Sequence, residues 1–208
     1  MTSPLDALPA QRKQGHEPFH ASGLPIGPHL TNFWQWMGSD VVSNTMRGLL
    51  AEYLVATALG VADGVRLDWE AYDLTTRAGV TIEVKSAAYL QRWQQAKPSA
   101  ISFSIRQTKG WNAETNTIDT TLKRQAALYV FALLAHREKT TLDPLDVRQW
   151  QFFVLPTHRL DAVVPQQKTI GLNALRNLQP RACAFAALAE TIEHCATELA
   201  ADGSAAQH

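Results

Sequence analysis

Two β-rich runs joined by a glycine-containing loop constrain this chain more than any other feature of its sequence. The runs lie within residues 71–85 and flank residues 77–79, Arg-Ala-Gly. Three residues suit a hairpin loop, and Gly79 falls where such a loop takes a left-handed backbone. The segment therefore predicts an antiparallel β-hairpin, and a hairpin decides which side chains share a face.

The register of this hairpin brings charged side chains together. Counting outward from the loop pairs Asp73 with Glu83, and the alternation of faces puts Lys85 beside them. The other, buried face is expected to carry Tyr72, Leu74, Ile82 and Val84. Two carboxylates about 5 Å apart repel each other by roughly 3 kcal/mol at an effective dielectric of about 20. The pair therefore needs a shared proton, the Lys85 ammonium or a bound divalent cation.

A third carboxylate lies on a helix predicted upstream, from about Asp40 to Leu59 and closed by Gly60. Between residues 49 and 59 only Glu52 and Thr57 are polar, so the helix is expected to be buried on nearly all sides. A buried carboxylate needs a positive partner. Three carboxylates and a lysine at the end of a hairpin make an oxygen-rich site suited to Mg²⁺ or Mn²⁺.

The rest of the chain predicts an α/β or α+β domain around a central mixed sheet. Strands are expected at residues 65–69, 101–105 and 150–155, and helices at residues 172–178 and 182–199. The apolar run of residues 128–134 is a strand candidate, although its length also suits a short buried helix. Five of the ten prolines fall in the first 28 residues, which predicts an extended arm over residues 1–30. Residues 201–208 are predicted to form a disordered tail, so the folded domain is expected to span residues 31–200.

Asp73, nine intervening residues and then Glu83-Val84-Lys85 resemble the signature of the PD-(D/E)XK nuclease superfamily. Residues 47–52 are similar to the acidic N-terminal helix of many members, including archaeal Holliday-junction resolvases. Ser86 and Gln91 also fit the superfamily pattern, whereas Tyr72 stands where the signature often has proline. The resemblance implies an α/β fold with a restriction-endonuclease-like core, in which a central mixed β-sheet is flanked by helices.

The same resemblance implies a role for each site residue. Asp73 and Glu83 would ligate Mg²⁺ or Mn²⁺ together with the carbonyl of Val84. Lys85 would act at the attacking water, and Glu52 would be a further ligand of the metal or of water. A divalent ion held in this way can stabilise charge on a phosphodiester in the transition state and acidify a bound water.

Local charge favours a polyanionic partner, although the formal net charge is +0, which excludes binding of nucleic acid by bulk charge. Residues 40–84 carry a net charge of −4 and residues 85–124 a net charge of +5. A basic stretch beside an acidic site suits an enzyme that contacts the phosphate backbone. The residues expected to contact substrate are Ser86, Gln91, Arg92, Lys97, Arg106 and Lys109.

These features predict a Mg²⁺-dependent endonuclease that hydrolyses DNA. The resemblance also allows a homodimer, because many enzymes of this fold cut two strands as dimers. The longest apolar run has ten residues, too short for a membrane helix, and no export segment is evident, so a cytoplasmic enzyme is expected. Two alternatives stay open. The same fold could bind DNA or a protein with little or no catalysis, or the carboxylates could serve another metal-dependent hydrolysis.

Overall fold

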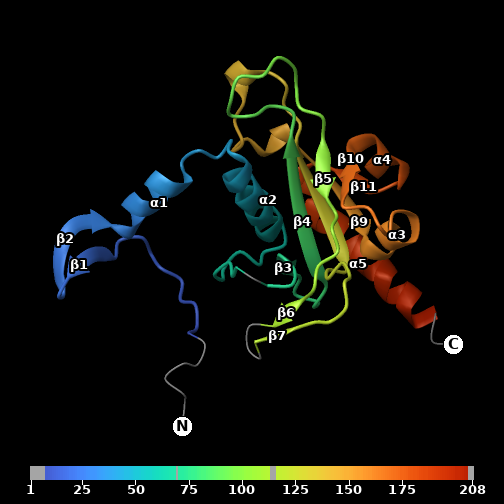
Figure 1. Ribbon diagram of the computed structural model, residues 1–208, viewed down its shortest axis with the longest axis horizontal. Coiled ribbons are helices and arrows are strands. Elements are labelled where there is room, and N and C mark those ends of the chain that lie inside the picture. Colours follow the sequence, from blue (N-terminus) through green and yellow to red (C-terminus); the bar gives the residue numbers. More distant parts are fainter. Residues whose placement is uncertain (1–7, 69, 113–115, 206–208) are drawn as a thin grey trace, which may run out of the picture.

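A five-stranded mixed sheet forms the centre of the computed structural model, which describes residues 8–68, 70–112 and 116–205. The strand order is β11-β9-β8-β4-β3, and only β4 and β8 are parallel. The strands are β3 (Leu74–Thr75), β4 (Thr81–Ala88), β8 (Leu128–Leu134), β9 (Trp150–Pro156) and β11 (Arg181–Cys183). The predicted central mixed sheet flanked by helices is thereby confirmed (Figure 1).

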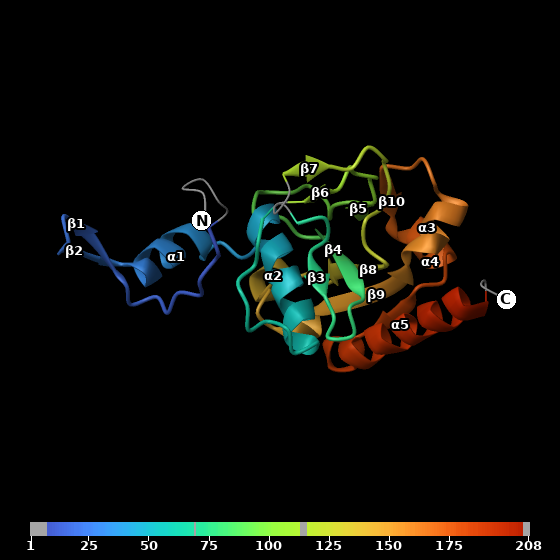
Figure 2. The same ribbon diagram turned by 90° about the horizontal axis from the view of Figure 1, so that it is seen from below.

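Helices cover both faces of this sheet (Figure 2). One buried cluster joins the sheet to α2 (Asn44–Ala58) and α5 (Leu188–Ala205). A second cluster, on the other face, joins it to α3 (Thr157–Val163), α4 (Leu172–Asn177) and a ribbon. That ribbon pairs β5 (Ser102–Ser104) with β10 (Thr169–Gly171). The remaining elements are β6 (Trp111–Asn112), β7 (Thr117–Ile118) and three short 3₁₀ turns at Lys139–Thr141, Val147–Gln149 and Phe185–Ala187.

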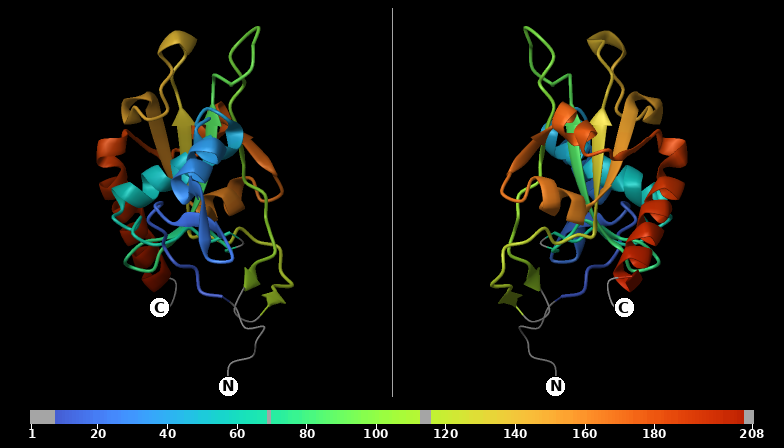
Figure 3. Two further views of the ribbon diagram at one scale, coloured as in Figure 1. Left: turned by 90° about the vertical axis from the view of Figure 1, so that its left-hand side faces the viewer. Right: turned by 90° about the vertical axis from the view of Figure 1, so that its right-hand side faces the viewer.

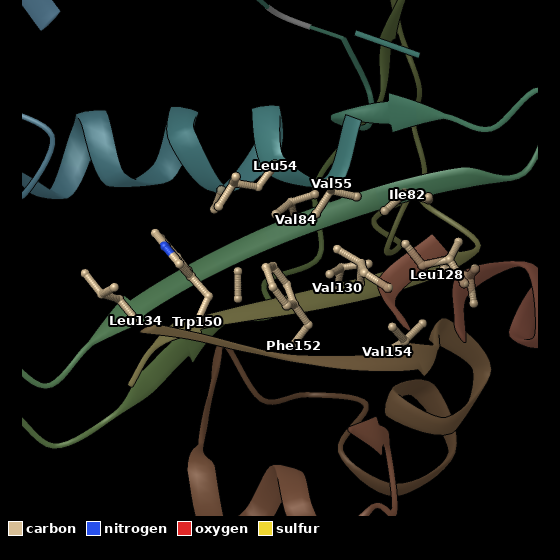
Figure 4. Close-up of a cluster of buried hydrophobic side chains, with 14 of the residues drawn as sticks. Leu54, Val55, Ile82, Val84, Leu128, Val130, Leu134, Trp150, Phe152 and Val154 are labelled. Carbon is tan, nitrogen blue, oxygen red and sulfur yellow. The ribbon is translucent and has the colours of Figure 1, made fainter. Parts of the chain in front are cut away.

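The core explains why these strands form where the sequence predicts them. Every residue of β8 is buried, as expected for an apolar strand covered on both faces. In β4 the side chains alternate, and Ile82 and Val84 pack under Leu54 and Val55 of α2 (Figure 4). Each such buried aliphatic side chain contributes about 1.5–3 kcal/mol.

An N-terminal module lies to one side of this core (Figure 1). It consists of the hairpin β1 (Pro18–Ala21) and β2 (Leu24–His29) followed by α1 (Leu30–Gly38). Neither buried cluster contains a residue from it. At the other end α5 continues to Ala205, into the segment expected as a tail, and it lies on the same side of the sheet as α2 (Figure 3). None of the helices described is long and apolar enough to span a membrane.

Two predicted elements are wrong. Residues 65–68 form a loop rather than a strand, because no neighbouring strand pairs with them, and Val65 and Leu67 stay exposed; Trp69 lies outside the described residues. The C-terminal helix begins at Leu188 rather than Ala182, because residues 181–183 pair with the open edge of β9. Pairing at an available sheet edge outweighs the helix propensity of this alanine-rich segment.

Candidate active site

The hairpin of β3 and β4 forms with the predicted register. Thr75 pairs with Thr81 and Leu74 with Ile82, and the amide of Thr76 donates to the carbonyl of Val80 at 2.9 Å. Gly79 has a φ of +83°, the left-handed conformation that the loop requires.

Asp73 lies just before β3, and its carboxylate turns toward the neighbouring strand β4. β3 begins at Leu74, and the amide of Asp73 donates to the carbonyl of Ile82 at 3.0 Å. The Asp73 carboxylate turns to β4, where Oδ2 accepts a hydrogen bond from the amide of Val84 at 2.7 Å. The expected direct pairing with Glu83 is therefore not part of the ladder. Since the amide and carbonyl of a strand residue point to the same edge, the Val84 carbonyl lies on the Asp73 side of β4.

Glu83 and Lys85 lie on the face of β4 away from α2 and form an ion pair. Burial raises the pKa of Glu83 above its usual value; the positive charge of Lys85 opposes this, and the charge of Asp73 adds to it. The Lys85 ammonium was one of three expected sources of compensation for the paired carboxylates, and this ion pair supplies it. Glu83 remains a carboxylate whose ionised form gains from further positive charge.

Glu52 faces a different cation. On α2 its carboxylate accepts two hydrogen bonds from Arg66, which also pairs with Asp68. Burial raises the pKa of Glu52, the hydrogen bond from Arg66 opposes that shift, and the charge of Asp73 adds to it. The positive partner expected for Glu52 is therefore Arg66. No local pattern selected Arg66, because it lies in the loop that was predicted to be a strand.

The donors present suit a hard divalent cation bound together with substrate. Within the described ranges, no three His, Cys, Asp or Glu side chains are grouped as a complete metal site. Asp73, Glu83 and the Val84 carbonyl nevertheless offer only oxygen atoms. Mg²⁺ is usually held by one or two carboxylates, with waters and substrate phosphate completing its coordination. Two carboxylates and a carbonyl fit that requirement, and a third carboxylate is not needed.

Tyr129 is a member of the site that no sequence signal singled out. It is the register partner of Glu83 on the parallel strand β8, and its side chain lies on the same face of the sheet. Burial raises the pKa of its hydroxyl, and the charge of Glu83 adds to the shift. The hydroxyl therefore stays protonated and can act as a hydrogen-bond donor beside the carboxylates. The only hint was a phenol within an otherwise apolar strand.

A cleft of about 880 Å³ opens beside the acidic residues. Glu52 and Asp73 line it, together with aromatic and basic side chains. Other residues of its wall are Arg12, Trp34, Tyr53, Arg66 and Tyr72. The arm is held near the cleft by Arg12, which donates to the carbonyls of Ala62 and Asp63 at 3.2 and 2.5 Å. The N-terminal module thus contributes to the walls of the site.

Two of the predicted substrate contacts lie on or just after β4. Ser86 is on β4, where its side chain faces α2. Gln91 is buried, and its amide group donates to the Ala88 carbonyl and the Ser99 hydroxyl at 3.1 and 3.2 Å. Gln91 therefore supports the loop after β4.

The remaining predicted contacts are exposed cations. Arg92 pairs with Asp40 at 3.4 Å, and Lys97, Arg106 and Lys109 are exposed. Arg124, another cation of the basic stretch, is buried instead, donates to the carbonyls of Ile105 and Val164, and pairs with Asp161. It is an internal clamp and not a surface contact.

Comparison with known proteins relates this site to nucleases. Residues 35–173, about two thirds of the chain, match the model of the family described as bacteriophage T4 endonuclease IV. The matched segment runs from within α1 to the start of α4 and contains every residue predicted for the site. No curated protein and no solved structure matches the chain.

Proposed function

The chain belongs to the bacteriophage T4 endonuclease IV family and is a nuclease, and we propose that it hydrolyses phosphodiester bonds of DNA with Mg²⁺ or Mn²⁺ bound by Asp73 and Glu83. The observation that carries the proposal is the place of these carboxylates inside the matched segment, on one hairpin and beside Lys85. The Asp-(x)₉-Glu-x-Lys spacing and the mixed sheet support a restriction-endonuclease-like member of the PD-(D/E)XK superfamily.

The cation would be held by Asp73, Glu83 and the Val84 carbonyl. When bound, it supplies a Lewis acid for a phosphate oxygen and lowers the pKa of water. The Asp73 carboxylate is fixed by the Val84 amide, so its second oxygen can point toward the site without losing its orientation. Glu83 is desolvated, which favours binding of positive charge.

Lys85 and Tyr129 would act on the phosphate and the attacking water. The Lys85 ammonium lies beside Glu83 and can stabilise the negative charge that develops on the phosphate oxygens. The Tyr129 hydroxyl can donate a hydrogen bond to the same group. Glu52, held by Arg66, would orient water at the edge of the cleft rather than complete the metal site.

We also propose how the enzyme contacts DNA, that it forms a homodimer, and that it is cytoplasmic. Its exposed cations Arg92, Lys97, Arg106 and Lys109 would contact the phosphate backbone. A homodimer would let one assembly cut two strands. Two free cysteines agree with a cytoplasmic enzyme.

The test is cleavage of DNA by the purified chain. Supercoiled plasmid and single-stranded circles are incubated with Mg²⁺, and with EDTA as the metal-free control. We expect cleavage with Mg²⁺ only, and a loss of at least about 100-fold in Lys85→Ala and Asp73→Ala with unchanged circular dichroism. Cleavage that survives in either folded variant contradicts these roles.

Two other results would favour the alternatives. DNA binding without cleavage by the wild-type chain would indicate a binding module on the same fold. Hydrolysis of a small phosphoester or a carbohydrate, but not of DNA, would indicate an enzyme of another class.

A further inference from the structure

Arg47 carries a buried guanidinium with two nitrogen atoms that find no hydrogen-bond partner among the described residues. The residue is only 6% exposed, and its Nε and Nη1 atoms are buried without a hydrogen bond. No other buried side-chain nitrogen in the described part of the chain lacks a partner. Arg124 is as deeply buried, yet it donates to three backbone carbonyls and pairs with Asp161. The fold can therefore satisfy a buried arginine, and at Arg47 it does not.

The position of Arg47 on α2 makes this arrangement more costly. Arg47 follows directly after the first turn of the helix, which carries a partial positive charge and contains no acidic residue. The first amides of an α-helix have no acceptor within the helix, and of these the amide of Met46 donates to the hydroxyl of Ser43 at 3.3 Å. Burial also lowers the pKa of Arg47, which is the sign of an unfavourable environment for its charge. An anion would relieve each of these costs.

The neighbouring strand offers further hydrogen-bond donors. A Cβ added at Gly48 would lie 4.0 Å from Oγ of Ser86, so the Ser86 hydroxyl faces the start of α2. β3 pairs only with Thr81 and Ile82, and Asp73 covers the amide of Val84. Alternate amides of a strand point to the same edge, so the Ser86 amide faces the part of this edge that β3 does not reach.

We propose that Arg47 and Ser86 bind a backbone phosphate of the DNA that neighbours the phosphate being cleaved. The proposal rests on the nuclease function above. Ser86 follows Lys85 on β4, and the two side chains point to opposite faces. A DNA strand that passes along the open edge of β4 would present one phosphate to Glu83 and Lys85 and an adjacent one to Arg47. Arg92, held near the start of α2 by Asp40, adds positive charge on this side.

The test replaces Arg47 by an apolar side chain of similar length. DNA binding by the full chain is measured in EDTA, where no cleavage is expected, by the anisotropy of a labelled oligonucleotide over a range of KCl concentrations. Arg47→Met should bind about tenfold more weakly. The slope of log affinity against log salt should fall by about one. Without DNA, its unfolding midpoint in urea should equal or exceed that of the wild type, because an unpaired buried charge has been removed.

Arg148→Met is the matched control, because Arg148 is exposed and pairs only with nearby Asp146. It removes the same charge and should leave both affinity and salt slope unchanged. A lower unfolding midpoint in Arg47→Met, with wild-type affinity and slope, would overturn the proposal and make Arg47 structural. If Arg47→Met does not fold, Arg47→Lys should keep the slope and lose part of the affinity. Wild-type DNA affinity in Arg47→Lys would then overturn the proposal.

A second measurement separates this proposal from the nuclease function. Inorganic phosphate should raise the thermal midpoint of the wild type above that in chloride of equal ionic strength, and should not do so in Arg47→Met. A wild-type chain that shows this difference but never cleaves DNA would disprove the nuclease and retain the phosphate site. A wild-type chain that cleaves DNA but shows no phosphate effect, and whose DNA affinity does not change in Arg47→Met, would retain the nuclease function and disprove the phosphate site.

Discussion

Arg66 is the hydrogen-bonded partner of a largely buried carboxylate of the site. The side chain of Glu52 is only 14% exposed, and Arg66 is its hydrogen-bonded partner. Arg66→Met would leave this carboxylate unpaired, so we expect it to lower the free energy of unfolding by about 1–3 kcal/mol. Urea unfolding at pH 7 measures the change. Arg148→Met, which breaks an exposed ion pair, should cost less than about 1 kcal/mol. Equal losses in the two variants would show that Glu52 does not depend on Arg66.

Glu83 is expected to make stability depend on pH. Burial raises its pKa in the folded protein above the unfolded value of 4.5. Its contribution to stability is therefore fully present below pH 4.5 and is lost as the pH rises through the folded pKa. Glu83→Gln should be more stable than the wild type above that pKa, and its advantage should disappear as the pH falls toward 4.5. Urea midpoints between pH 4 and 8 test this, and an advantage that grows toward low pH would contradict it.

At the scale of elements, the hairpin loop sets the position of Asp73. Gly79 has a φ of +83°, and a Cβ there would meet no atom within 4 Å. Gly79→Ala therefore tests backbone strain alone, and we expect a loss of about 1–2 kcal/mol. Gly64→Ala is the control, because Gly64 is equally open but does not have a left-handed φ. A loss in Gly64→Ala as large as that in Gly79→Ala would show that the left-handed conformation is not the cause.

The elements that could be predicted are those with a strong local signal. Gly79 gave the register of β3 and β4, and the apolar run of residues 128–134 gave β8. Gly60, with a φ of +65°, ends α2 as expected. Residues 181–183 could not be assigned to β11, because their conformation depends on the open edge of β9, which is distant in sequence.

The residues of the site also divide into those with a local sequence signal and those placed by contacts distant in sequence. Asp73, Glu83 and Lys85 could be selected because a hairpin register is local, and Glu52 because it interrupts an apolar helix. The turn of the Asp73 carboxylate onto the Val84 amide could not be foreseen from alternation of side chains. Arg66 and Tyr129 join the site only through packing of the loop and of β8, which no local pattern reports.

On the scale of the whole molecule, the N-terminal module shares no buried apolar cluster with the core. No residue between 8 and 38 belongs to either buried cluster, although Arg12 and Trp34 line the cleft. A chain that begins at Ser39 should therefore fold with an unfolding free energy within about 1 kcal/mol of the full chain. Urea unfolding by circular dichroism measures it, and a chain that is unfolded without residues 1–38 would contradict this prediction.

The proposed chemistry depends on a divalent cation held by Asp73 and Glu83 next to Lys85. Its most direct test is an anomalous difference map from crystals soaked in Mn²⁺. We predict a peak within ligand distance of the carboxylates of Asp73 and Glu83, near the Val84 carbonyl, which disappears in Asp73→Ala. A wild-type crystal that shows a Mn²⁺ peak elsewhere and none between these two carboxylates would contradict the account.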